Sequence, residues 1–141
     1  MDGKICELCA TSGGTTLWES PTCRVVRVDD PQYPGFCRVI WTAHVREMTD
    51  LEPGERQFMM NLVFAVEKVV RTLFAPDKVN LASLGNLTPH LHWHVIPRWR
   101  DDRTGWGAWI FGTRYLELNQ ARYLDTFFAA RLVVVAFGVA F

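Results

Sequence analysis

The sequence lacks both an excess of charge and an apolar run long enough to span a bilayer. Lysine plus arginine equals aspartate plus glutamate, at 15 each in 141 residues, so no overall field attracts a nucleic-acid polymer or an anionic membrane. The apolar stretch from Leu132 to Phe141 is far shorter than the roughly 20 residues that a spanning helix needs. We therefore expect neither a nucleic-acid polymer nor a membrane as a partner.

The first residues, Met1 to Cys6, lack the apolar segment of a secretory leader, which predicts a cytoplasmic location. Thiols are reduced in that compartment, so the four cysteines are not expected to form disulfides. Internal repeats and low-complexity tracts are absent from the sequence as well. A length of 141 residues with 49% hydrophobic residues suits one domain with its own core.

Between these absences, strand-like segments surround a single helical segment. Apolar side chains recur at helical spacing after Pro53, where Glu52 or Asp50 can cap the helix, and Pro76 ends it. Strands are expected where β-branched and aromatic residues gather, at residues 22–28, 36–41, 79–84 and 90–97. The helix lies between the second and third of these strands.

Three of the four histidines fall within five residues, at His90, His92 and His94. Apolar residues, Leu91 and Trp93, fill the gaps between them. A strand sends successive side chains to opposite faces, so this spacing predicts a row of imidazoles on one face and apolar side chains on the other. One face is then available for packing and the other for chemistry.

The histidine row also allows two other interpretations. A solvated strand face would carry assorted polar residues, whereas this one carries imidazole three times. A single three-histidine metal centre fits poorly, because His90 and His94 lie about 13 Å apart along a strand at roughly 3.3 Å per residue, and Zn–N bonds measure about 2 Å. A polar catalytic row is the interpretation that we favour.

The segment GNLTPHLHWHVIPRW, residues 85–99, resembles the histidine triad (HIT) family, whose signature is His-x-His-x-His-x-x with apolar x. The likeness extends to Tyr33-Pro34-Gly35-Phe36 at a strand start and to Thr42-Ala43-His44 before the long helix, an order found in the family's bacterial branch. It covers roughly residues 6–100.

The resemblance implies an α+β fold, a HIT-like antiparallel sheet with one long amphipathic helix packed on it. We expect a HIT domain over residues 1–103, followed by a C-terminal extension over residues 104–141 that packs on the same domain. The resemblance also implies a homodimer that binds a nucleotide or a nucleotide conjugate.

By the same resemblance, His92 is the nucleophile that attacks an α-phosphorus and forms a nucleotidyl-histidine intermediate. Imidazole suits this role because its ordinary pKa near 6.5 leaves a neutral nitrogen at cellular pH. His94 is expected to hydrogen-bond a phosphate oxygen or the leaving atom, and His90 completes the catalytic row. The expected activity is that of a nucleotide hydrolase or nucleotidyl transferase acting on a phosphoanhydride or phosphoramidate bond.

Four further residues are expected to contact the substrate. Gly85 has no Cβ and lets backbone N–H groups approach an anion, while Asn86 stands where many relatives have glutamine. Asn80 approximates a family asparagine of the phosphate pocket, and Arg98 offers positive charge to a polyphosphate. The alternatives are a simple turn at residues 85–86 and a solvated arginine.

The N-terminus contains Cys6-x-x-Cys9, a spacing that suits one soft divalent ion. In bacterial HIT relatives such a pair holds zinc together with a histidine after the second strand and the first triad histidine, here His44 and His90. The resemblance thus implies a closed structural zinc site. A redox-active pair is disfavoured because no helix-forming run begins directly after Cys9.

A second function stays open at this point. Relatives hold the ribose hydroxyls with a small polar side chain where this sequence has Val28. A nucleotide-binding or scaffold module that turns over negligibly is therefore the alternative to an enzyme, and a metal-storage protein is the third possibility.

Overall fold

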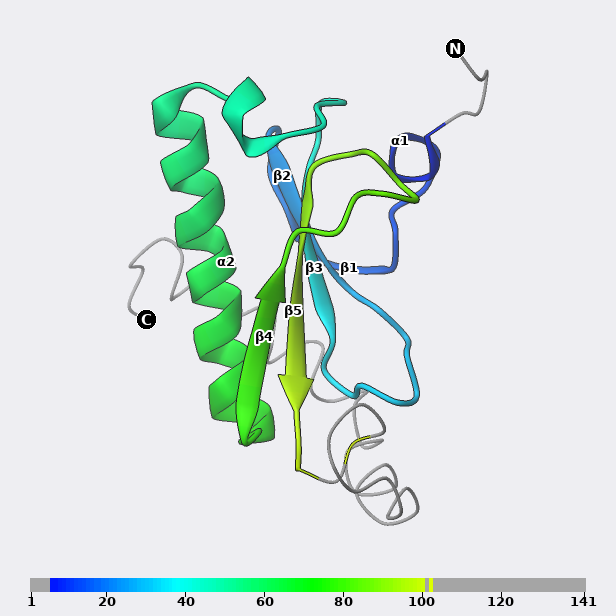
Figure 1. The fold of residues 1–141 in the computed structure, drawn as a ribbon, viewed down its shortest axis with the longest axis vertical. Coiled ribbons are helices and arrows are strands. Elements are labelled where there is room, and N and C mark those ends of the chain that lie inside the picture. Colours follow the sequence, from blue (N-terminus) through cyan, green and yellow to red (C-terminus); the bar gives the residue numbers. More distant parts are fainter. Residues whose placement is uncertain (1–5, 101, 103–141) are drawn as a thin grey trace.

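The computed structural model describes residues 6–100 and 102, which form one antiparallel sheet flanked by helices (Figure 1). The spatial order of the strands is β1-β2-β3-β5-β4. Each neighbouring pair runs antiparallel. The five strands are β1 (Thr15–Glu19), β2 (Cys23–Arg27), β3 (Cys37–Trp41), β4 (Lys78–Ala82) and β5 (His92–Arg98).

The long helix α2 (Pro53–Phe74) covers one face of the sheet (Figure 1). It begins with proline in its first turn, and the backbone N–H of Glu52 donates to the Glu55 carboxylate at 2.9 Å. It ends where Ala75 adopts a left-handed conformation just before Pro76. The buried side chains of α2 repeat at helical spacing and are Met59, Leu62, Val63, Ala65, Val66, Val69 and Val70.

These helix residues pack against every second residue of the sheet, including Val25, Val39 and Val95, all 0% exposed. This packing buries the apolar face of strands β2 to β5 and leaves the alternate residues on the opposite face. The expected α+β fold with one long amphipathic helix on an antiparallel sheet is confirmed. Among the described residues, no helix is long and apolar enough to cross a membrane.

The opposite face of the sheet is partly covered by the N-terminal segment, which contains the one-turn helix α1 (Glu7–Ala10). Leu8 packs there against Val26 and Ile40. The guanidinium of Arg24 on β2 donates to the backbone carbonyls of Leu8 at 2.6 Å, Ser12 at 3.0 Å and Thr11 at 3.2 Å. This arginine therefore fixes the segment that carries Cys6 and Cys9 to the sheet.

Two elements were not expected from the sequence. Strand β1 has mostly exposed or half-buried side chains, so its pairing with β2 specifies it more than its own pattern does. Helix α1 is only one turn long and gives no periodic signal. A 3-10 turn at Met48–Asp50 also precedes α2.

The histidine strand begins later than expected. β5 starts at His92, and His90 lies before it because its N–H bonds back to the Thr88 carbonyl at 2.8 Å, in a tight turn around Pro89. Strand β4 likewise ends at Ala82 and not at residue 84. The boundary at residue 103 and the extension 104–141 lie outside the described residues, so that division stays a prediction.

Candidate functional site

Strand β5 places two of the three triad histidines on the sheet face that points away from α2. Leu91, Trp93 and Val95 belong to the core beneath the helix. His92 and His94 occupy the other face, with ring centroids 4.8 Å apart. The alternation along this segment thus separates packing from chemistry as the sequence predicts.

His92 is held in one orientation by the backbone of its neighbour. The side chain is 5% exposed, and its Nδ1 lies 2.5 Å from the carbonyl oxygen of His90. A carbonyl only accepts, so Nδ1 carries the proton and Nε2 keeps the lone pair of a neutral ring. Ser83 adds a hydrogen bond from its hydroxyl to the His92 carbonyl at 2.9 Å.

Burial lowers the pKa of His92, and the positive charge of Arg38 lowers it further, against the raising effects of the His90 carbonyl and the Glu7 charge. The ring is therefore neutral at physiological pH. Nε2 makes no hydrogen bond within the described part of the chain. It is not fully buried either, so a ligand can reach it. It is the ring nitrogen of His92 that the fold leaves available to a ligand.

His94 lies beside His92 and against the ring of Phe36, whose centroid is 5.3 Å away. Its Nε2 is buried with no hydrogen-bond partner among the described residues. Burial lowers the pKa of His94 to about 4, and the nearby His92 and Arg38 contribute to that shift. A neutral ring with one unpaired nitrogen can serve a ligand as a hydrogen-bond partner.

The depressed pKa of His94 predicts a loss of stability in acid. Unfolded histidine takes up a proton near pH 6.5, whereas the folded ring does so only near pH 4, so its contribution is present above pH 6.5 and is lost as the pH falls toward 4. We expect about 2–3 kcal/mol less acid destabilisation in His94→Gln than in wild type between pH 7 and 4.5. Urea unfolding at both pH values measures this, and equal pH dependence in the two proteins would contradict it.

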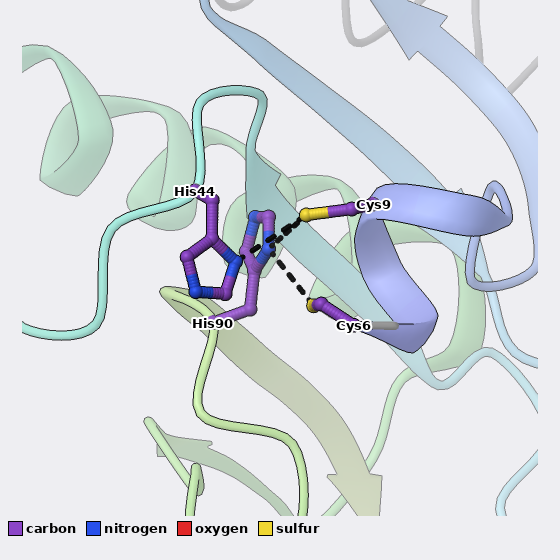
Figure 2. Close-up of side chains that lie close together, drawn as sticks. All are labelled: Cys6, Cys9, His44 and His90. Carbon is purple, nitrogen blue, oxygen red and sulfur yellow. Dashed lines mark hydrogen bonds between the residues drawn. The ribbon is translucent and has the colours of Figure 1, made fainter. Parts of the chain in front are cut away.

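A second cluster lies at the end of the sheet near α1 (Figure 2). It joins Cys6 and Cys9 to His44, in the loop after β3, and to His90, just before β5. One ligand atom from each of the four residues lies within 4.8 Å of all the others. The Nδ1 of His90 is 3.4 Å from both sulfurs, and the Nδ1 of His44 is 3.3 Å from the Cys9 sulfur.

The three nitrogen–sulfur distances fit tetrahedral coordination of one ion. Zn–S bonds of about 2.3 Å and Zn–N bonds of about 2.0 Å separate neighbouring donors by about 3.3–3.8 Å. The Nε2 of His90 donates to the Trp41 carbonyl at 2.7 Å, which leaves Nδ1 as the free lone pair facing the sulfurs. Burial lowers the pKa of His90 and thus favours the neutral ring that a metal requires. The four residues suit a soft divalent metal.

The two clusters meet at His90. Its side chain belongs to the cysteine cluster, whereas its backbone carbonyl orients the ring of His92. The triad side chains are thus divided between two clusters, and the structure does not place three imidazoles around one point. A centre built from His90, His92 and His94 together is not formed in this structure.

Three of the expected substrate residues lie on β4 and in the loop that follows it. Asn80 on β4 is exposed on the same sheet face and pairs with Ile96, two residues along β5 from His94. Gly85 and the exposed Asn86 belong to the loop from β4 to β5, and Gly85 has no positive φ or close contact that demands glycine. Their contacts with substrate stay predictions.

Arg98 is engaged elsewhere in this structure. Its guanidinium forms a two-pronged ion pair with the buried carboxylate of Asp102, with Nη2 at 2.6 Å. It also lies over the Tyr33 ring, 5.4 Å from the centroid. A role for Arg98 in holding substrate would require this ion pair to open or to be shared.

One charged residue on the triad face was missed by the sequence analysis. Arg38 on β3 pairs with His94 across the strands. It is the only charged residue in the expected strand at 36–41, and it stands at the parity opposite to the buried Cys37 and Val39. That alternation could have identified Arg38, but the partner strand could not be assigned from the sequence.

Comparison with known proteins agrees with this architecture, which is that of a histidine triad domain. The family model described as "HIT domain" matches residues 12–101. The chain therefore belongs to the HIT family. The resemblance found in the sequence is confirmed.

Solved structures show the same fold. A histidine triad protein from Marinobacter aquaeolei VT8 is 27% identical, with a TM-score of 0.68 and coverage of 97% of this chain and 98% of that one. A histidine triad protein from Bradyrhizobium japonicum is 21% identical, with a TM-score of 0.67 and coverage of 95% and 98%. The second likeness concerns the fold alone.

Curated relatives match over a shorter segment. The asymmetrical bis(5'-nucleosyl)-tetraphosphatase of Schizosaccharomyces pombe is 31% identical over 77 residues, and the match covers 51% of this chain and 42% of that protein. The AP-4-A phosphorylase of Mycobacterium tuberculosis (strain CDC 1551) is 31% identical over 78 residues, 51% and 40% of the two lengths. The match thus spans less than half of either relative.

Proposed function

We propose that the protein is a nucleotide hydrolase or nucleotidyl transferase that acts at an α-phosphorus through a covalent intermediate on His92. The observation that carries this proposal is the hydrogen bond from Nδ1 of His92 to the His90 carbonyl, which leaves Nε2 as a neutral nucleophile. Membership of the HIT family and the nucleotide-cleaving names of its distant relatives support the same class of activity.

In the proposed reaction, Nε2 of His92 forms a bond to the α-phosphorus of a nucleotide with a phosphoanhydride or phosphoramidate linkage. The linkage to the leaving group breaks, and the leaving group departs with the bonding electron pair. The ring becomes positively charged, and the Nδ1–H bond to the His90 carbonyl stabilises that charge. Water then attacks phosphorus as the default acceptor, which breaks the P–N bond and releases the nucleoside monophosphate.

His94 is proposed to hydrogen-bond a phosphate oxygen or the leaving atom through its unpaired Nε2. Asn80, Gly85, Asn86 and Arg98 remain proposed substrate contacts. The partner is a nucleotide or a nucleotide conjugate. A homodimer and a cytoplasmic location are part of the same proposal.

For the cysteine cluster we propose a structural zinc ion held by Cys6, Cys9, His44 and His90. A closed set of four protein ligands leaves no position for substrate, so the ion would supply cross-linking and not activation. The ring of His90 would be fixed on one side by the metal and on the other by the Trp41 carbonyl. The backbone of His90, which orients His92, would be fixed as well.

Trapping of the intermediate tests the proposed function. Wild-type protein incubated with a radiolabelled adenylylated substrate and quenched in base is expected to retain labelled nucleotide, because the base stops turnover. His92→Ala should retain none, and its melting temperature should show that it is folded. Reversible binding of the substrate by wild type with neither labelling nor turnover would contradict an enzyme and favour the binding module.

A further inference from the structure

Arg38 lies on the triad face of the sheet beside both histidines of the proposed reaction. Its register partner on β5 is His94, and the next pair along that face joins Ile40 to His92. Its positive charge acts on the rings of His92 and His94. The proposed mechanism assigns no task to this residue.

The guanidinium of Arg38 is held in place, but not all of its N–H groups donate hydrogen bonds within the described residues. Its Nη1 donates to the Gly13 carbonyl at 3.2 Å, and its central carbon lies 5.7 Å from the centroid of the Phe36 ring. Phe36 in turn contacts His94. Nε is buried with no hydrogen-bond partner among the described residues. Nη2 also makes no hydrogen bond there, but it is not buried and can be reached from solvent.

Two other arginines share this face, but more of their donors are bonded within the protein. Arg24, on β2, gives its donors to three backbone carbonyls of the N-terminal segment. Arg98 is bound bidentately by the Asp102 carboxylate. The guanidinium of Arg38 donates to one carbonyl and lies over one aromatic ring. It therefore has more N–H groups left for a ligand than Arg24 or Arg98.

The chemistry at His92 calls for a cation at this place. The substrate phosphate is anionic, and the strand register places the positive charge of Arg38 directly beside His94 on this face. An anion brought to such a half-buried face needs charge-assisted hydrogen bonds. Attack by a neutral nitrogen leaves the phosphoryl oxygens charged, and a preorganised cation stabilises them.

We infer that Arg38 is a substrate-contacting residue that binds a non-bridging oxygen of the α-phosphate through Nη2. This inference rests on the proposed function, because it assigns a partner to the phosphate that His92 attacks. The contact with the Phe36 ring and the hydrogen bond to the Gly13 carbonyl hold the guanidinium on the triad face.

Equilibrium binding separates phosphate recognition from other roles of Arg38. Isothermal titration calorimetry with adenosine 5'-monophosphate (AMP) and with uncharged adenosine compares wild type, Arg38→Gln and Arg38→Lys. We expect Arg38→Gln to weaken AMP binding by roughly tenfold to a hundredfold while adenosine binding changes less than about twofold. Arg38→Lys should recover part of the loss, because it restores the charge without the fork.

Arg27→Gln is the matched control, because it removes one positive charge from β2 at a position paired with Cys37 and thus on the helix-covered face. Its AMP affinity is expected to equal that of wild type. If Arg38→Gln does not fold, Arg38→Met replaces it, since methionine keeps an unbranched stem over Phe36.

The outcomes distinguish the two proposals. AMP affinity unchanged in Arg38→Gln would overturn the inference and leave the proposed function standing. Equal losses of AMP and adenosine binding would overturn it too, because they would show a structural role. Absence of AMP binding in wild type would overturn nucleotide recognition, and the role of Arg38 with it.

Discussion

Replacement of Cys9 by serine is expected to abolish stoichiometric zinc binding and to lower the free energy of unfolding by about 4 kcal/mol. That is the stabilisation that linkage gives when the free ion stands about a thousandfold above its dissociation constant. Cys9 contacts both histidines of the cluster. Without the ion, the N-terminal segment keeps the Arg24 contacts, the hydrogen bond from Arg38 to Gly13 and the small cluster around Leu8.

Elemental analysis and urea unfolding measure the two effects. Cys37→Ala is the control, because Cys37 is 1% exposed in the core beneath α2 and should lower stability without loss of zinc. A chelator should destabilise wild type and Cys37→Ala but not Cys9→Ser. Equal zinc content in wild type and Cys9→Ser would remove the metal proposal.

Turnover of an adenylylated nucleotide is expected to fall about 10⁴-fold in His92→Ala, which corresponds to a barrier higher by about 5.5 kcal/mol. The loss is large because, among the described histidines on the triad face, only His92 has its tautomer fixed by a backbone carbonyl. His90 also bonds a carbonyl, but its remaining nitrogen faces the cysteine sulfurs.

His94→Gln provides the comparison for this measurement. Glutamine can still donate a hydrogen bond, so we expect a smaller loss, roughly tenfold to a hundredfold. Steady-state rates under substrate saturation, with melting temperatures as a check on folding, give both values. A His92→Ala variant that retained more than a tenth of wild-type turnover would contradict a nucleophilic role.

The zinc and turnover predictions are coupled through one residue. Loss of the metal should loosen His90, and its carbonyl is the group that orients His92. His90 would thus link the N-terminal cysteine pair, which its ring contacts, to the proposed reaction at His92, which its carbonyl orients.

Much of the fold could be predicted from local patterns. Helix α2 was expected because its apolar residues repeat at helical spacing between a capping glutamate and Pro76, and these signals are local. Strand β1 was missed because its side chains are mostly exposed and its place depends on β2. The start of β5 was misplaced because the turn at Thr88 is a backbone hydrogen bond that no side-chain pattern records.

The candidate metal ligands and the nucleophile could be named from residue type and family likeness. Asn80, Gly85 and Asn86 were named in the same way, and their roles still depend on binding experiments. Arg38 could not be named, because its importance comes from lying opposite His94 on a strand more than fifty residues away in sequence.

The sequence by itself determined which chemistry is available to this protein: imidazoles at every second residue, two thiols three residues apart and one amphipathic helix of sufficient length to cover a sheet. Only the tertiary structure decided which of these groups lie together. The turn before β5 sends the His90 side chain to the cysteines and its carbonyl to His92, and the strand register brings Arg38 beside His94. Periodicity and residue type are properties of neighbours along the chain, whereas register and hydrogen-bond partners arise from segments that meet only when the chain folds.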